Sequence, residues 1–339
     1  MTIPYRTRRV LKRLGIGVVT VLTLAVVAWL CWMLWLGRYV IYTRDGGARL
    51  DFGRSSLDIA GDPAPKPEPV TPVPIYYNEG ENALNVSREL TQIMGYYVTA
   101  KDLEGDISAV KTKLQTLEKG TAVMVDVKNI QGGFFYSSGI HDIRAKSIDT
   151  GAMDELLDYL QLSDLYTIAR LPAFRDYYYG LDHVPDGLPT AGGYLWMDDD
   201  RCYWLSPASQ GTMAYLVEIV NELKALGFDE VVFTDFRFPD TNEIVFKSDK
   251  NEALAQAAQL LVKTCATDSF AVSFTGAASF PVPEGRSRLF VTGADASDAS
   301  VIAENSGLEN PQVRLVFLTD LHDTRFEAYS VLRPLSSAN

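Results

Sequence analysis

Apolar, strand-like runs alternate with amphipathic, helix-like runs over most of the chain, which is the pattern of β/α units around a parallel sheet. In the helix-like runs, apolar residues recur every three and four positions, as they do on the buried face of a helix. Strands are predicted at about 95–100, 121–128, 165–171, 203–206, 230–236, 270–275, 288–292 and 313–318. Helices are predicted at 106–118, 151–160, 209–226 and 249–265.

The number of these units predicts the fold class. Eight strands with intervening helices in roughly 245 residues fit a (β/α)8 TIM-type barrel of the α/β class better than an open doubly wound sheet. No Gly-x-Gly-x-x-Gly sequence follows the first strand, so a dinucleotide fold is disfavoured and no cofactor is predicted. The barrel domain is predicted to span 91–335.

A long uncharged segment precedes the barrel. Residues 14–36 carry no charge, and about 23 residues at about 1.5 Å each are long enough to cross a bilayer. Five basic residues in segment 1–13 place the N-terminus in the cytoplasm and the rest of the chain outside. We predict a single-pass anchor in the cell membrane. A cleaved signal peptide is the alternative, but no small-x-small site follows the apolar run before Arg38.

Residues 37–90 show little periodicity and are rich in proline. Alternating prolines favour an extended chain without internal hydrogen bonds. This segment is therefore predicted to be an extracellular spacer between the membrane and the barrel. Its prolines include Pro63, Pro65, Pro67, Pro69, Pro72 and Pro74.

The composition of the chain limits which partners, disulfides and metal sites are expected. Hydrophobic residues make up 47% of the 339 residues, enough for a substantial core, and the formal charge of −12 argues against nucleic acid as a partner. Cys202 and Cys265 are predicted to be separate buried thiols, with a disulfide as the alternative. The three histidines are isolated from any cysteine or paired-histidine spacing, so no metal site is predicted.

Charged residues end two neighbouring predicted strands. By strict alternation, Ala122, Met124, Asp126 and Lys128 share the inward face of the second strand, and Arg170 ends the inward face of the third. We expect Asp126, Lys128 and Arg170 to form a group at the barrel mouth, where TIM barrels carry their active sites. Such a group fits substrate binding or, alternatively, a structural salt-bridge network.

The fifth predicted strand adds Asp235 and Arg237 to the rim. Glycoside hydrolysis uses two carboxyl groups that flank the sugar linkage, one to donate a proton and one to attack or to activate water. Asp235 and Asp126 are the predicted catalytic pair. The alternative is that Asp235 only orients Arg237 or caps the following loop. Further candidates for the second acid are Asp198, Asp240 and Asp320.

The connection from 172 to 204 is long and aromatic. Long loops in compact domains are usually functional or disordered, and its many aromatic residues argue against disorder. Aromatic faces beside acids would suit a carbohydrate, although packing onto the barrel explains any single ring equally well. The predicted partner is a polysaccharide or cell-envelope glycan. The residues predicted to bind it are Lys128, Arg170, Arg237, Asp198, Trp196 and Tyr178.

Five sequence motifs, taken in order, resemble a bacterial glycosyl hydrolase family formerly classed as a domain of unknown function. The resemblance implies a TIM barrel related to glycosidases, with Asp126, Lys128, Arg170 and Arg237 at matched rim positions. The motifs are Gly-Tyr-Tyr-Val-Thr-Ala at 95–100; Val-Asp-Val-Lys at 125–128 with Gly132; Ile-Ala-Arg at 168–170 with Phe174 and Asp176; Trp-Leu-Ser-Pro at 204–207; and Gly-Phe-Asp-Glu-Val-Val-Phe-Thr-Asp-Phe-Arg-Phe-Pro at 227–239.

One position departs from the family pattern. In that pattern the acid of the fifth strand lies three residues before the arginine, but here Thr234 stands in that place and Asp235 lies only two residues before Arg237. Neighbouring residues of a strand face opposite ways, so an unbroken strand would turn Asp235 away from the mouth. A bulge at the strand end could restore its direction.

Two functions follow as hypotheses. The first is a membrane-anchored, extracytoplasmic glycoside hydrolase that acts on a polysaccharide through Asp235 and Asp126. The alternative is a barrel that binds glycan, or serves as a scaffold at the cell envelope, without cutting. A third possibility, an aldolase-like Schiff base on Lys128, is disfavoured because the neighbouring Asp126 would keep the lysine protonated.

Overall fold

The computed structural model describes residues 21–30, 32–33, 40–42, 48–50 and 89–338. The chain divides into two compact units, Met1–Ala83 and Leu84–Asn339. In the first unit, residues 21–30 and 32–33 are helical. Strands β1 (Val40–Tyr42) and β2 (Ala48–Leu50) pair there as a small antiparallel sheet.

Much of the predicted N-terminal organisation falls outside these residues. Segment 1–13, about half of the predicted membrane span 14–36, and most of the predicted spacer 37–90 are not among the described residues. Within the part of the chain that the structure describes, no helix combines the length and apolar character that a membrane crossing requires.

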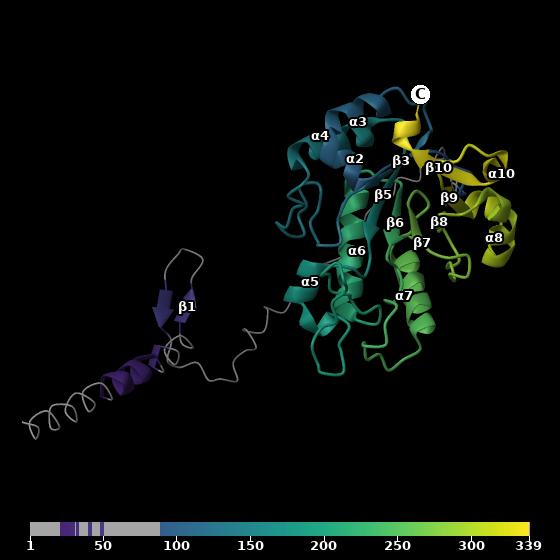
Figure 1. Ribbon diagram of the computed structural model, residues 1–339. Coiled ribbons are helices and arrows are strands. Elements are labelled where there is room, and N and C mark those ends of the chain that lie inside the picture. The colour runs from purple at the N-terminus through teal and green to yellow at the C-terminus, as the bar shows by residue number, and fades with distance from the viewer. Residues whose placement is uncertain (1–20, 31, 34–39, 43–47, 51–88, 339) are drawn as a thin grey trace, which may run out of the picture. The chain divides into compact units, whose positions relative to one another are not determined.

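The second unit is a closed barrel of eight parallel strands, which confirms the predicted TIM-type fold (Figure 1). The last strand closes the barrel by pairing with both the first and the preceding strand. In chain order the strands are β3 (Met94–Val98), β4 (Ala122–Asp126), β5 (Tyr166–Pro172), β6 (Glu230–Thr234), β7 (Ala271–Thr275), β8 (Leu289–Thr292), β9 (Leu315–Leu318) and β10 (Ser330–Pro334).

Helices cover the outside of the barrel, and the four predicted ones are all present within a few residues of their expected bounds. Polar side chains cap their first turns, as Ser209 does for α6 and Asp249 for α7. Both of these long helices run beside the strands in Figure 1. The helices are α2 (Ala100–Gly105), α3 (Ile107–Leu114), α4 (Thr150–Leu162), α5 (Tyr177–Asp182), α6 (Gln210–Ala225), α7 (Lys250–Cys265), α8 (Ala299–Ser306), α9 (Pro311–Arg314) and α10 (Thr324–Glu327), with 3-10 turns η1 (Val184–Asp186), η2 (Ala296–Asp298) and η3 (Leu335–Ser337).

The prediction of the fourth strand at 203–206 is wrong. This segment makes only isolated antiparallel bridges, such as Trp204 with Arg175 and Leu205 with Gly187, inside the long connection between β5 and α6. Trp204 and Leu205 are apolar because they bury that connection against the outer core. The eighth barrel strand is instead β10, which the sequence analysis did not predict.

Side chains alternate between the two faces of the barrel strands. Outward residues pack against the helices in two apolar clusters, and inward residues fill the barrel with a third. Asp126 pairs in register with Arg170, and Pro172 with Thr234, so the carboxyl ends of β4, β5 and β6 meet at one rim. The inner cluster consists of Ile93, Ala122, Met124, Ile168, Val232, Phe290, Val316, Leu318 and Leu332.

A buried charged network lies at the amino-terminal end of the barrel. Glu230 at the start of β6 forms an ion pair with Arg288, which directly precedes β8, and their side chains are 0% and 1% exposed. Glu230 also accepts hydrogen bonds from Tyr166 Oη, at 2.9 Å, and from Ser273 Oγ. Arg288 donates to the carbonyl oxygen of Thr91 at 2.9 Å. Both charges are therefore matched by partners inside the barrel, as buried charges require.

Candidate functional site

The carboxyl ends of β4 and β5 place Asp126 beside Arg170 at the barrel mouth. Arg170 donates from Nε to Oδ1 of Asp126 at 2.5 Å and from Nη2 to Oδ2 at 3.0 Å. Oδ2 accepts a further hydrogen bond, at 2.8 Å, from the backbone N–H of Ala100 at the start of α2. The two side chains are 16% and 17% exposed. Asp126 and Arg170, two members of the predicted mouth group, are thus in direct contact, and both remain partly open to solvent.

A cavity of about 330 Å³ lies at this rim, bordered by Asp126, Arg170 and Thr234. Thr234 ends β6 two residues after the inward-facing Val232, so it shares the inward face of the strand. This is the position at which the family pattern carries its acid. The cavity therefore has a hydroxyl group where that pattern has a carboxylate.

Lys128 borders the mouth cavity together with Asp126 and Arg170, but its ion-pair partner is Asp176. The side chain of Lys128 is 1% exposed and its Nζ lies 2.6 Å from Oδ2 of Asp176, whose side chain is 0% exposed. β4 ends at Asp126, so strict alternation no longer governs where Lys128 points. The alternative interpretation of Lys128, a structural ion pair, is the one that the structure favours.

Asp176 holds several parts of the domain together. Besides Lys128, its carboxylate accepts hydrogen bonds from Tyr215 Oη of α6 at 3.0 Å and, as the N-cap of α5, from the backbone N–H of Tyr179 at 2.8 Å. A Cβ on Gly132 would lie 2.4 Å from Oδ1 of Asp176, and Gly132 has a φ of 93°. Only glycine lets the 129–133 turn approach this carboxylate so closely.

Asp235 directly follows β6 and has a left-handed backbone conformation, with a φ of 50°. The pairing of β6 with β5 is regular up to Thr234, and Asp235 is not among the residues that border the mouth cavity. Burial raises the pKa of Asp235, against the lowering effect of the positive charges of Arg175 and Arg237. No described residue donates a hydrogen bond to its carboxyl group.

Arg175 connects the acidic residues of the long loop. Its Nη2 lies 2.6 Å from Oδ2 of Asp198 and 2.7 Å from Oδ2 of Asp200. Asp198 also accepts hydrogen bonds from the backbone N–H of Cys202 at 2.9 Å and from Trp204 Nε1 at 2.8 Å. Burial acts to raise the pKa of Asp198, but these hydrogen bonds and the charge of Arg175 together lower it. Asp198 therefore anchors the loop as a carboxylate.

Aromatic residues surround this second group. The guanidinium carbon of Arg237 lies 5.0 Å from the ring centre of Trp204. Trp196 donates from Nε1 to Glu243 at 2.9 Å, and its ring centre lies 6.4 Å from that of Trp204. Tyr178, in α5, is exposed. Trp196 and Tyr178 both lie in the long connection between β5 and α6, and their binding role stays a prediction.

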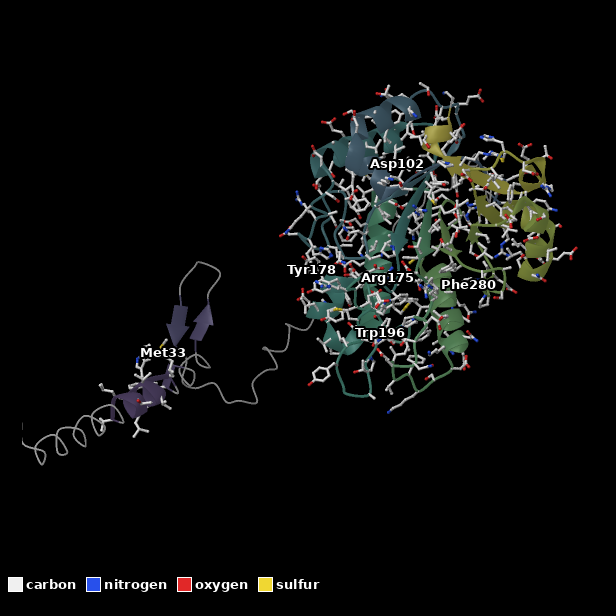
Figure 2. All side chains as sticks on the ribbon, in the orientation of Figure 1. Met33, Asp102, Arg175, Tyr178, Trp196 and Phe280 are labelled. Atoms are coloured by element: carbon white, nitrogen blue, oxygen red, sulfur yellow. The ribbon has the colours of Figure 1, made fainter. Side chains whose placement is uncertain are left out.

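The predicted site residues fall into two groups. The mouth group contains Asp126 and Arg170, and the loop group contains Asp235, Asp198, Arg237 and Trp196. In Figure 2, Trp196 lies well away from Asp102 of α2, the helix whose first residue contacts Asp126. The contacts therefore do not bring the predicted pair, Asp126 and Asp235, into one group. The other candidate acids, Asp240 and Asp320, are exposed.

Arg175 is the residue that sequence reasoning missed. It has no place in a barrel strand or in a predicted helix, and only its position between Phe174 and Asp176 of the third motif marked the segment. Its Nε has no hydrogen-bond partner among the described residues, although the atom is buried. A polar ligand or water molecule near Asp235 would satisfy this donor.

Both cysteines of the described barrel are free and buried. This confirms the prediction of two separate thiols. Burial raises the pKa of Cys202 to about 12, and its Sγ lies 2.9 Å from the carbonyl oxygen of Ile130. Within the described residues, no three His, Cys, Asp or Glu side chains form a group that could hold a metal ion.

Asp235→Asn is expected to remove a contribution that lowers the stability of the domain as pH rises. The pKa of Asp235 is raised in the folded state, so this group makes the free energy of unfolding fall as pH rises from the ordinary range of a carboxyl group through the raised value. Asparagine does not ionise and tolerates the left-handed backbone. In urea unfolding between about pH 4 and pH 7, the free energy of unfolding of the variant should rise relative to that of the parent as pH rises. Equal pH slopes would contradict this.

The fold and the mouth define a (β/α)8 barrel domain with charged residues at the carboxyl ends of its strands. A family model described as "Putative glycosyl hydrolase domain" matches residues 95–271, more than half of the chain. The chain therefore belongs to this family. None of the curated proteins compared with the chain matches it.

Several solved structures resemble this chain in part, at low sequence identity. A hypothetical protein from Ruminiclostridium thermocellum is 22% identical over 53% of this chain and 96% of that chain, with a TM-score of 0.46. The glycoside hydrolase domain of PelA from Pseudomonas aeruginosa is 13% identical over 73% and 95%, with a TM-score of 0.45. An exo-β-N-acetylglucosaminidase from Vibrio harveyi is 9% identical over 68% and 42%, with a TM-score of 0.48. With TM-scores below 0.5, these likenesses define neither activity nor substrate.

Proposed function

We propose that this domain is a glycan-binding barrel on a glycosyl hydrolase fold, with the mouth cavity as its ligand site. The observation that carries the proposal is the hydroxyl group of Thr234 at the inward end of β6. Among the described residues that border the cavity, Asp126 alone carries a carboxylate. Cleavage by two carboxyl groups needs both to flank the linkage. The mouth offers groups that hold a ligand but lacks the second acid.

The aromatic loop extends this proposed binding surface. Tyr178 and Tyr194 expose their rings to solvent, and Tyr194 is 79% exposed. Exposed aromatic residues are the ones that can stack on sugar rings without unfolding a core. We propose that a polysaccharide of the cell envelope or the environment contacts both the mouth and this loop.

A parallel binding and cleavage assay tests the proposal. The full-length chain is incubated with insoluble cell-wall and plant polysaccharides, and both the bound protein and the released reducing ends are measured. We expect retention on at least one polysaccharide and no release of reducing ends. Asp126→Asn should weaken binding by about tenfold or more, because a charged hydrogen-bond acceptor at the cavity is lost. Retention on no polysaccharide would overturn glycan binding.

Asp235→Asn is the matched control for this assay. It changes one carboxyl group of the loop group to an amide and leaves the mouth cavity unchanged. We therefore expect this variant to bind polysaccharide as the parent does. Thermal unfolding of both variants shows whether Asp126→Asn loses binding merely because it unfolds. If the parent chain releases reducing ends and Asp235→Asn does not, the domain is an enzyme.

Hydrolysis is the second candidate function, and the two loop carboxyl groups favour it. The pKa of Asp235 is raised by burial, and that of Asp198 is lowered by its hydrogen bonds and Arg175. Two carboxyl groups whose pKa values are shifted in opposite directions can serve as a proton donor and an ionised partner. In this case Asp235 would donate the proton, with Asp198 or Asp126 as the second carboxyl group.

The location of the protein is a proposal that rests on the sequence of segment 14–36. We propose a single-pass anchor in the cell membrane, with the N-terminus in the cytoplasm and the barrel outside. The full-length chain should stay with membranes after alkaline extraction, and protease added to intact cells should reach the barrel. Release of the chain by alkali would overturn the anchor.

A further inference from the structure

The hydrogen bonds of Asp126 leave it one place for a ligand. A carboxylate has about four acceptor sites, two on each oxygen. Oδ2 accepts from Arg170 and from the N–H of Ala100, whereas Oδ1 accepts only from Arg170. One acceptor site on Oδ1 therefore remains, on a side chain that is 16% exposed and borders the cavity. A ligand that meets Asp126 must offer an N–H or O–H group.

Hydrogen-bond donors border the same cavity. Among the described residues, none bonds to the hydroxyl group of Thr234 or to the side-chain N–H groups of Asn129, whose Oδ1 accepts from the N–H of Gly133 at 2.9 Å. These groups are able to donate to a carbonyl oxygen. The cavity thus combines one free acceptor with several free donors.

The rest of the cavity wall is largely apolar. Ile130, Phe135 and Pro172 border it beside the polar groups. Its volume of about 330 Å³ is at the lower end of the range for small-molecule sites, which is about 300–1,000 Å³. A single sugar unit with one substituent is a ligand of the right scale, and a methyl group would be buried favourably against such a wall.

We propose that the mouth cavity recognises a 2-acetamido sugar unit of a glycan, through the acetamido group. That group offers the N–H that Asp126 can accept, the carbonyl oxygen that Thr234 and Asn129 can bind, and a methyl group for the apolar wall. A hydroxyl group at the same carbon would satisfy Asp126 but leave the donors and the wall without partners. This inference rests on the proposed glycan binding and names its ligand class.

Two oligosaccharides of equal length and linkage form the test. Chitotetraose and cellotetraose differ at carbon 2 of each sugar, which carries an acetamido group in the first and a hydroxyl group in the second. Titration calorimetry of the full-length chain should give about tenfold or more tighter binding of chitotetraose, from one buried methyl group and an added hydrogen bond. Equal affinity for both, or tighter binding of cellotetraose, would overturn the inference.

Variants locate the binding energy in the cavity. Thr234→Val removes one donor and keeps the shape and the strand preference of the side chain, so we expect it to reduce the preference for chitotetraose over cellotetraose. Ile130→Ser should act in the same direction by removing part of the apolar wall. An unchanged preference in both variants would place the acetamido group elsewhere and overturn the inference.

The outcome also separates this inference from the proposed function. Binding of polysaccharides that lack acetamido groups, with no preference for chitotetraose, would overturn the ligand class and leave glycan binding in place. Failure of the chain to bind any glycan in the wider panel would overturn glycan binding itself.

Discussion

Replacing Arg288 with methionine is expected to lower the free energy of unfolding of the barrel domain by about 3–5 kcal/mol. The change leaves the carboxylate of Glu230 without its charged partner, and the side chain of Glu230 is 0% exposed. Tyr166 and Ser273 would still donate to Glu230, but two neutral hydrogen bonds do not replace an ion pair in the barrel interior. Urea unfolding followed by tryptophan fluorescence measures the loss.

The double variant Arg288→Met with Glu230→Gln is the control. It removes both charges and keeps an amide that can bond to Tyr166 and Ser273, so it should be more stable than Arg288→Met alone. A loss below about 1 kcal/mol in the single variant would contradict the expectation, because it would mean that Glu230 reaches water or takes up a proton at little cost.

Asp176→Ala is expected to cost still more, at or above the upper end of about 3–5 kcal/mol. The change leaves the ammonium group of Lys128 buried without a counter-ion, at 1% exposure. It also removes the N-cap of α5 and the acceptor for Tyr215 Oη, and a lost cap alone costs about 1 kcal/mol. The same urea unfolding measures the change.

Lys128→Met is the comparison for Asp176→Ala. It removes the ion pair from the other side but leaves the carboxylate of Asp176 with the donors of Tyr179 and Tyr215. We therefore expect a smaller loss than in Asp176→Ala. If Lys128→Met proves the more damaging change, the lysine has a further role that the ion pair does not explain.

The sequence predicted the barrel and its rim residues because both follow from alternation along strands. Inward positions of β4 and β5 are two residues apart, so Asp126 and Arg170 must end neighbouring rows in a parallel sheet. Seven of the eight barrel strands and the longer helices were found from the same periodicities. Alternation applies only within the strand, so it did not predict that Lys128, two residues past Asp126, pairs with Asp176.

Features that depend on partners distant in sequence could not be predicted. Lys128 pairs with Asp176 because the 129–133 turn folds back onto α5. No local sequence pattern predicts this fold of the chain. Asp235 takes a left-handed conformation that aspartate tolerates but does not require. Arg175 forms ion pairs with Asp198 and Asp200, which lie in a loop without sequence periodicity. Contacts of this kind are fixed by tertiary packing rather than by a repeat in the sequence.

The buried network of Glu230 and Arg288 makes the barrel a blind pocket rather than a tunnel. Above it, the inner apolar cluster fills the space up to the mouth with side chains such as Met124 and Phe290, which are fully buried. A polymer can therefore enter only from the rim. A sugar chain held at the mouth must lie across it or insert one end, and it cannot be threaded through the domain.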